Sequence, residues 1–312
     1  MYDVIIIGGA AAALTAAIYS SRRAMKTLII AKSIGGQAAM TDVIENYPGF
    51  LSVGGIPLMN KMLKQATKSG AEINFEEVNS IDEISKKNEK SIFNVKTTAG
   101  SKYKTKTVIL AYGKTPRTLD VPGEGKFGAK GVSYCVTCDG PLFNGKNVAV
   151  VGGGNSALEG AEYLSKICPK VYLVHRRDAF RGFEYLVKEV KSRKNIEILY
   201  NSAVKEIKGG NSVQSIVVED FAKGGTKEIL VSGVFVEIGS VTKTEFIKQL
   251  VKLDQIGQVI TNNYAETFYP DSEKIRPGIF AAGDLTQTPF KQIVVSAGEG
   301  CIVADWVSKK KK

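Results

Sequence analysis

The feature that most constrains this fold is a short apolar run followed by a glycine-rich turn and a helix-favouring stretch, which occurs twice. The first copy begins at Tyr2–Ile7 and continues into Gly8-Gly9 and an alanine-rich segment. The second begins at Val148–Val151 and continues into Gly152-Gly153-Gly154-Asn155-Ser156-Ala157. A further apolar run follows each copy, at Thr27–Ile30 and Val171–Val174. Strand, tight turn, helix and strand in this order form a β-α-β unit. We therefore expect an α/β protein containing two such units.

The length and the breaks in this pattern indicate two domains. A chain of 312 residues is long enough for two domains of about 100–200 residues each. Two segments interrupt the regular pattern, Gly113-Lys-Thr-Pro116 and Gly239–Lys243. If both are crossings between domains, the middle of the chain is inserted into a domain built from its two ends. We expect a discontinuous domain of residues 1–115 and 243–312 and an inserted domain of residues 116–242.

The second glycine turn has the spacing of a dinucleotide-binding loop. It reads G-x-G-x-x-A between a strand and a helix, which is the context that gives this pattern its meaning. Gly152 permits the tight turn, and Gly154 lets the backbone approach a pyrophosphate held at the helix N-terminus. The fold class is therefore Rossmann-like in this domain. The expected nucleotide contacts from this loop are Gly152, Gly154, Asn155, Ser156 and Ala157.

A basic cluster after the next strand predicts which nucleotide binds there. An NAD site places an acid at this point, whereas this chain has His175-Arg176-Arg177 and then Arg181. Guanidinium groups match the oxygens of a 2′-phosphate in paired hydrogen bonds, so we expect NADPH rather than NADH. The alternative is a solvated basic turn. His175 is the only histidine, and we expect it to pack locally or near the phosphate and not to act as a catalytic base.

The first glycine turn departs from the dinucleotide pattern. Ala10 stands where a glycine normally allows phosphate approach, and Ala31-Lys32 ends the second strand without an acid. A distal segment, Ala281-Ala-Gly283-Asp284, supports a second nucleotide site, because a turn of small residues followed by a carboxylate can approach the ribitol hydroxyls of a flavin. We therefore expect two Rossmann-like domains, each with its own nucleotide.

A dithiol motif, Cys135-Val-Thr-Cys138, lies between the two nucleotide patterns. Two thiols at this spacing can close a small disulfide ring, and the acid that follows, Asp139, can move the proton that thiol–disulfide exchange requires. The other cysteines, Cys168 and Cys301, lie on expected helices among apolar neighbours, so we expect buried structural thiols. The four cysteines have no zinc-ligand spacing, and no metal is expected.

Composition adds a basic surface and argues against a membrane protein. The net charge is +11, which suits nucleic acid, a membrane surface, an acidic protein partner or simply a lysine-rich solvated face, and the last is our interpretation. No segment approaches the roughly 18 apolar residues of a membrane span. The N-terminus lacks a basic region and runs directly into a strand, so we expect no signal peptide. In a reducing cytosol a lone C-x-x-C motif indicates a catalytic dithiol rather than a structural disulfide, and we expect a cytoplasmic protein that binds neither nucleic acid nor membrane.

Together these motifs resemble the low-molecular-weight thioredoxin reductases of bacteria and archaea, from Tyr2 to about Val307. The motifs that carry the resemblance are Gly35-Gly36-Gln37, Glu45-Asn46-Tyr-Pro-Gly49, Ser133-Tyr-Cys-Val-Thr-Cys-Asp-Gly140, Gly152–Ala157, His175-Arg-Arg-Asp-Ala-Phe-Arg181, Gly278–Asp284 and Lys291-Gln292. The resemblance implies FAD in the discontinuous domain, NADPH in the inserted one, a homodimer, and thioredoxin as the acceptor of electrons. It also implies a large rotation of one domain against the other.

The resemblance further implies roles for single residues. Cys138 would face the isoalloxazine, Cys135 would attack the partner's disulfide, and Asp139 would be the acid and base. The implied FAD contacts are Gly8, Ala11, Ala12, Gly35, Gly36, Gln37, Asn46, Gly113, Gly283, Asp284, Lys291, Gln292 and Ile293. The implied NADPH contacts add His175, Arg176, Arg177 and Arg181 to the glycine loop.

Three residues depart from the family pattern: Ala10 replaces a glycine, Ala11 a proline, and Tyr112 a small residue or threonine. Two alternatives therefore stay open. One is a reductase of the same fold that serves another redoxin or a peroxiredoxin, or that accepts electrons from a donor other than NADPH. The other is a degenerate flavin-binding module. The glutathione-reductase class needs a differently spaced cysteine pair and a C-terminal histidine, which this chain lacks.

Overall fold

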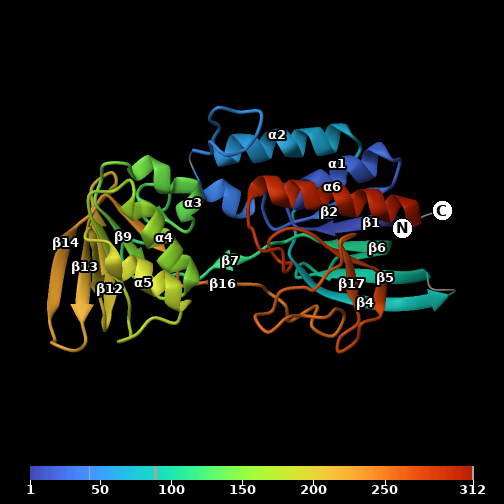
Figure 1. The fold of residues 1–312 in the computed structure, drawn as a ribbon. Coiled ribbons are helices and arrows are strands. Elements are labelled where there is room, and N and C mark those ends of the chain that lie inside the picture. The colour runs from blue at the N-terminus through green and yellow to red at the C-terminus, as the bar shows by residue number, and fades with distance from the viewer. Residues whose placement is uncertain (42, 88–89, 311–312) are drawn as a thin grey trace. The chain divides into compact units, whose positions relative to one another are not determined.

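The chain forms two compact α/β units, shown in Figure 1. The computed structural model describes residues 1–41, 43–87 and 90–310. The first unit contains Met1–Met40, Tyr47–Thr115 and Val241–Lys312, and the second contains Thr41–Asn46 and Pro116–Ser240. The chain passes between the units on either side of Thr41–Asn46 and again at two short strands. These strands, β7 (Thr115–Pro116) and β16 (Ser240–Val241), pair with each other.

The first unit is built on a sheet whose central strands are parallel. The strand order is β17-β18-β6-β1-β2-β3, and an antiparallel hairpin of β4 and β5 joins it through β6. Its elements are β1 (Tyr2–Ile7), α1 (Ala11–Arg22), β2 (Thr27–Ile30), η1 (Gly36–Met40), α2 (Gly55–Lys68), β3 (Glu72–Asn74), β4 (Val78–Lys87), β5 (Lys90–Thr97), β6 (Lys102–Leu110), β17 (Glu266–Phe268), β18 (Ile275–Ala281) and α6 (Ile293–Lys310).

Both faces of this sheet are covered, which explains why its central strands are apolar throughout. The helices α1, α2 and α6 lie on one side of the sheet (Figure 1), and α6 packs along α1. On β1, Ile5 and Ile7 belong to a core cluster that also contains Phe93 of the hairpin and Ile247. Val4 and Ile6, which point to the opposite face, are fully buried as well.

The second unit has three layers. Its parallel sheet has the order β11-β10-β9-β15-β8, with helices on one face and an antiparallel sheet of β12, β13 and β14 on the other. Its elements are β8 (Val132–Ser133), α3 (Val136–Asp139), η2 (Gly140–Phe143), β9 (Val148–Val151), α4 (Asn155–Ser165), β10 (Val171–Val174), α5 (Glu184–Ser192), β11 (Ile196–Leu199), β12 (Ser202–Gly209), β13 (Val213–Asp220), β14 (Thr226–Leu230) and β15 (Gly233–Val236).

Alternation along β9 shows how these layers are held together. Val148 and Val150 pack with Leu158 of α4, whereas Ala149 and Val151 pack with Ile216 of the antiparallel sheet. Each face of the parallel sheet therefore has its own apolar core. The strand ends at Val151, and the glycine loop follows at the carboxyl end of the sheet, where α/β proteins bind ligands.

Candidate active site

The two cysteines of the C-x-x-C motif form a disulfide within one turn of chain. Cys135 immediately precedes α3, which carries Cys138, and their Cα atoms are 5.3 Å apart. The backbone N–H of Cys138 donates a hydrogen bond to Sγ of Cys135 at 3.2 Å. An N–H directed at sulfur stabilises the charge of a thiolate, so this geometry favours ionisation of Cys135 after reduction.

Asp139 belongs to the same hydrogen-bond network as the disulfide. Ser133, at the end of β8, donates from its hydroxyl to Oδ2 of Asp139 at 2.6 Å. The same hydroxyl oxygen accepts the backbone N–H of Cys135 at 3.1 Å. Ser133 is 5% exposed, so this link is protected from water. The acid and the cysteine turn are therefore fixed by one buried serine, whose role the sequence analysis did not assign.

The glycine loop of the second unit leaves open space at the position expected for a pyrophosphate. A Cβ added at Gly152 would lie 2.3 Å from the carbonyl oxygen of Glu237, so only glycine fits there. Gly154 precedes α4 and has no neighbouring atom within 4 Å of such a Cβ. Gly152 therefore serves chain packing, whereas Gly154 leaves its backbone accessible to a ligand.

The arginine cluster is attached directly to this loop. The backbone N–H of Arg181 donates to the carbonyl of Gly153 at 2.9 Å. The side chains of Arg176, Arg177 and Arg181 are exposed, and within the described part of the chain no carboxylate forms an ion pair with them. Exposed guanidinium groups beside an open phosphate loop fit the 2′-phosphate of NADPH.

The side chain of His175 packs against the glycine loop. The ring is 5% exposed and packs against Gly153, where an added Cβ would lie 2.1 Å from Cε1 of the ring. Its Nε2 donates to the carbonyl of Ala179 at 3.0 Å. Burial lowers the pKa of His175, and the neighbouring arginines lower it further. The ring is therefore neutral near pH 7 and acts as a packing residue for the nucleotide loop.

In the first unit, the glycine loop after β1 is closed by backbone contacts. A Cβ added at Gly8 would lie 2.2 Å from the carbonyl oxygen of Ala111, and φ of Gly8 is +128°. Ala10 has an extended backbone, with φ −111° and ψ −167°, which an alanine adopts without strain. Alanine at position 10 is thus compatible with the fold, and its methyl group would weaken ligand binding rather than the stability of the protein. The expected contact residues Ala11 and Ala12 begin α1 and are buried.

The distal Gly-Asp segment lies against this loop. A Cβ added at Gly283 would lie 2.9 Å from Cβ of Ala12. Asp284 is partly buried and accepts a hydrogen bond from Ser296 Oγ at 3.1 Å, and burial raises the pKa of its carboxyl group. The structure therefore brings together the β1–α1 turn and the segment after β18, which are distant in sequence. A partly buried carboxyl at this point suits a ligand hydroxyl.

Lys291 adds a cation to the same region. Its ammonium donates to the carbonyl of Thr286 at 2.6 Å. Burial lowers the pKa of Lys291 to about 8, and nearby Lys114 contributes to the lowering. Ile293 begins α6 directly after Gln292. Lys114 was missed by sequence reasoning because nothing in the local pattern marks it.

The other residues expected to contact FAD lie on several separate segments of the chain. Gly35 and Gly36 have positive φ angles of +107° and +52°, and Gln37 donates from Nε2 to the carbonyl of Lys114 at 2.9 Å. Gly113 follows β6, with φ +67°. Asn46 belongs to the segment grouped with the second unit. The flavin contact expected for Asn46 stays a prediction.

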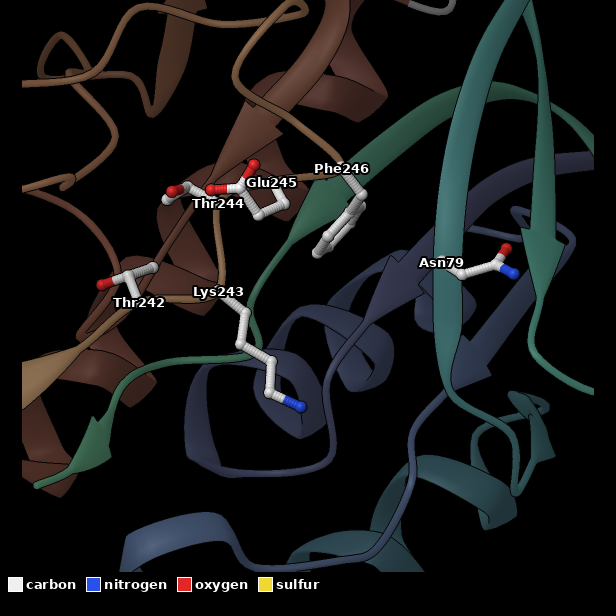
Figure 2. Close-up of a pocket in the computed structure, with 6 residues that line it drawn as sticks. All are labelled: Asn79, Thr242, Lys243, Thr244, Glu245 and Phe246. Carbon is white, nitrogen blue, oxygen red and sulfur yellow. The ribbon is translucent and has the colours of Figure 1, made fainter. Parts of the chain in front are cut away.

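Tyr112 anchors the chain that follows β16. Its hydroxyl donates to the carbonyl of Lys243 at 2.9 Å, and its ring packs 5.4 Å from that of Phe246. Burial raises the pKa of this tyrosine. Residues 242–246 and Asn79 line a hollow of about 420 Å³, and Figure 2 shows that Asn79 comes from a strand and the other five from one continuous segment. None of the expected site residues lines this hollow.

The free cysteines differ from each other. Cys168 is buried, as expected, and its burial raises the pKa of the thiol to about 11. The prediction for Cys301 was wrong, because this residue is only partly buried and its thiol contacts the hydroxyl of Tyr19 on α1. The described residues contain no cluster of ligands placed to hold a metal ion. They also contain no helix of the length and apolarity that a membrane span requires.

Comparisons with known proteins assign the family. The family model for pyridine nucleotide-disulphide oxidoreductases matches residues 2–300. The chain belongs to this family. It is 41% identical to the thioredoxin reductase of Bacillus subtilis over 98% of this chain and 94% of that protein. It is 36% identical to the thioredoxin reductase of Treponema pallidum, over 97% and 95% of the two chains.

A solved structure extends this agreement to the fold. The crystal structure of thioredoxin reductase from Streptococcus pyogenes has a TM-score of 0.91 to this chain, 35% identity, and coverage of 100% and 99% of the two chains. The two Rossmann-like units expected from the sequence are thereby confirmed as the architecture of this family member. FAD and NADPH, the cofactors expected from the motifs, are the cofactors of the pyridine nucleotide-disulphide oxidoreductases it resembles.

Proposed function

We propose that this protein is an NADPH-dependent thioredoxin reductase. In this proposal electrons enter from NADPH, pass through FAD to the Cys135–Cys138 disulfide, and leave to the disulfide of thioredoxin. The observation that carries the proposal is the second unit itself, in which a redox-capable disulfide and an arginine-marked nucleotide loop occur on one sheet. When bound, the cofactors supply hydride transfer and electron storage, and the protein supplies orientation and thiolate stabilisation.

We assign the chemistry to three residues. Cys138 exchanges electrons with the flavin, and Cys135 attacks the partner's disulfide as a thiolate stabilised by the N–H of Cys138. Asp139 donates and accepts the proton of this exchange, held in place by Ser133. The sulfur–sulfur bond breaks on reduction, and each disulfide exchange passes two electrons to the acceptor.

We assign the two nucleotides to the two domains predicted from the sequence. NADPH binds to residues 116–242 through the glycine loop and the cluster of His175, Arg176, Arg177 and Arg181. FAD binds to residues 1–115 and 243–312 through the β1–α1 turn, Gly35–Gln37 and the segment from Gly283 to Ile293. The open space at Gly154 and the partly buried carboxyl of Asp284 support these assignments.

We infer that thioredoxin or a thioredoxin-like protein is the acceptor, that the enzyme is a homodimer, and that it acts in the cytoplasm. The acceptor follows from the names of the relatives, and the net charge of +11 favours an acidic partner by electrostatic steering. The cytoplasm is the compartment in which few scattered cysteines and one catalytic C-x-x-C motif are usual, because structural disulfides are rare there.

A coupled assay tests the proposal. Purified enzyme with FAD, NADPH and thioredoxin should reduce the thioredoxin disulfide, measured by release of thionitrobenzoate from Ellman's reagent. Omission of thioredoxin provides the background rate. If the flavin is reduced by NADPH but thioredoxin stays oxidised while a peroxiredoxin or another redoxin is reduced, the acceptor assignment is wrong. If NADPH reduces no flavin, the electron route itself is wrong.

A further inference from the structure

Glu237 connects the nucleotide loop to the disulfide within the second unit. It follows β15, and its backbone N–H donates to the carbonyl of Val151 at 2.8 Å, directly before the glycine loop. Its carboxylate oxygen Oε1 accepts the backbone N–H of Val136, at 3.4 Å. Val136 lies between the two cysteines in sequence and is itself buried. A carboxyl group from a distant strand is therefore directed at the turn that carries the dithiol.

In the described part of the chain, no positively charged side chain pairs with the carboxylate of Glu237. Within the described residues Glu237 forms no ion pair, and the charged group acting on it is Glu159 of α4, which has the same sign. The other acid of the cysteine turn, Asp139, hydrogen-bonds to Ser133. Burial raises the pKa of Glu237 to about 7, against the Val136 hydrogen bond, which lowers it, and Glu159 raises it further. The carboxyl therefore changes charge near pH 7.

We propose that Glu237 is a positioning residue that couples the redox state of the Cys135–Cys138 pair to a proton on its own carboxyl group. Reduction breaks the sulfur–sulfur bond and leaves negative charge on the sulfur of Cys135, the residue that directly precedes Val136, whose amide Glu237 accepts. Like charges disfavour each other, so reduction favours the neutral form of Glu237 and oxidation favours the ionised form.

Reduction with Glu237 ionised takes up two electrons and two protons. The electrons break the sulfur–sulfur bond, one proton forms a thiol beside the remaining thiolate, and the other proton neutralises Glu237. The electrons come from a dithiol reductant in solution or, in the reaction proposed above, from reduced FAD. The inference rests on the redox role proposed for this disulfide, but it concerns an equilibrium that is measured without NADPH or thioredoxin.

Substitution at Glu237 separates charge from packing. Glu237→Gln keeps the shape and the acceptor for the Val136 amide but removes the charge. At low pH the parent carboxyl is neutral, so parent and variant should behave alike. At high pH the parent is ionised and opposes thiolate formation, so the variant should be easier to reduce. Glu237→Asp retains an ionisable group, whereas Glu237→Ala removes both the charge and the hydrogen-bond acceptor.

The experiment equilibrates the FAD-loaded enzyme with reduced and oxidised dithiothreitol between pH 5.5 and 8.5. Cys135 and Cys138 are then alkylated with iodoacetamide and quantified by peptide mass spectrometry. At pH 8.5 we expect the equilibrium constant for reduction to be about 3- to 10-fold larger in Glu237→Gln than in the parent, where a tenfold change equals about 30 mV. At pH 5.5 the two constants should agree within about twofold.

The remaining variants make the result decisive. Glu237→Ala should show the same divergence from the parent as Glu237→Gln, and it carries the test if the glutamine variant does not fold. Glu237→Asp should retain the pH response of the parent. Curves for the parent and both neutral variants that run parallel from pH 5.5 to 8.5 would overturn the proposal, because a purely structural role changes the equilibrium equally at every pH. A failure here with normal thioredoxin reduction would leave the proposed function intact.

Discussion

The backbone N–H of Arg181 donates to the carbonyl of Gly153 at 2.9 Å, so the arginine cluster and the nucleotide loop form one structural piece. A second contact reinforces this link, since Oδ1 of Asn155 accepts the backbone N–H of Phe183 at 2.8 Å. The backbone that carries Arg181 is therefore fixed relative to the loop before a nucleotide binds, which lowers the cost of ordering this segment.

Removing two of these guanidinium groups tests the choice of nucleotide. The double variant Arg176→Ala with Arg181→Ala loses charge-assisted hydrogen bonds to a 2′-phosphate, each worth about 1.5–3 kcal/mol. We expect the KM for NADPH to rise by about 100-fold or more, and the KM for NADH to change by less than about threefold. Steady-state kinetics with both nucleotides give the answer. Lys223→Ala, on an exposed turn of the same unit, serves as the control. An equal rise in KM for NADPH and NADH would show that these arginines do not recognise a 2′-phosphate.

The glycines of the loop should separate folding from binding. Gly154→Ala adds a methyl group to open space, so its thermal unfolding should match that of the parent while NADPH binding weakens. Gly152→Ala drives a methyl group into the carbonyl of Glu237 and should cost about 1–3 kcal/mol of stability. Differential scanning fluorimetry and fluorescence titration with NADPH distinguish the two effects. Unimpaired NADPH binding by Gly154→Ala would place the nucleotide elsewhere.

The strands that sequence reasoning located best are those buried on both faces. β1, β2, β9 and β10 have the predicted bounds, because continuous runs of valine and isoleucine mark such strands clearly. The antiparallel sheet of the second unit was only partly predicted, because β14 buries a single residue of its five, Ile229, and shows little periodicity. Weak patterns of this kind are decided by packing rather than by local propensity.

The chemistry of the site was predictable where it is local in sequence. The disulfide between Cys135 and Cys138 is confirmed, and both glycine loops lie between strand and helix as expected. The contacts of Ser133 with Asp139 and of Glu237 with Val136 were not foreseen. The second of these depends on β8 pairing with β15, a strand order that no local pattern encodes.

Loss of one sulfur should separate the two halves of the electron route. Cys138→Ser cannot form the disulfide, so reduction of thioredoxin should fall to background while NADPH still reduces the flavin. Stopped-flow absorbance at the flavin band measures the first step, and the coupled assay measures the second. Cys168→Ser, which replaces a buried thiol outside the motif, should lose at most stability. Residual thioredoxin turnover by Cys138→Ser would refute the dithiol role.

The stability of the enzyme should depend on pH through Glu237. Its folded-state pKa of about 7 lies above the ordinary value of 4.5, so its neutral form stabilises the fold at low pH. That contribution is complete below about pH 4.5 and is lost as the pH rises through 7. Glu237→Gln should therefore be about 1–3 kcal/mol more stable than the parent at pH 8, and equal to it near pH 4. Urea unfolding at the two pH values measures the difference. A gain of the same size at both pH values would contradict this assignment of charge.

Ala10 tests the interpretation of the first glycine loop. Its extended backbone suits alanine and glycine alike, so Ala10→Gly should leave the fold unchanged and relieve a methyl group near the expected pyrophosphate. We expect FAD to bind at least as tightly as in the parent, by up to about 1–3 kcal/mol. Fluorescence titration of the FAD-free protein with FAD gives the dissociation constant. Weaker binding would show that the phosphate loop lies elsewhere.

The most direct test of the electron route is an anaerobic titration of the FAD-loaded enzyme with NADPH. The flavin absorbance and the alkylation of Cys135 and Cys138 are followed together at each addition. We expect that NADPH reduces the flavin and that both cysteines become open to alkylation as more NADPH is added. Flavin that bleaches fully while the disulfide stays closed, or protein that binds no flavin at all, would contradict it.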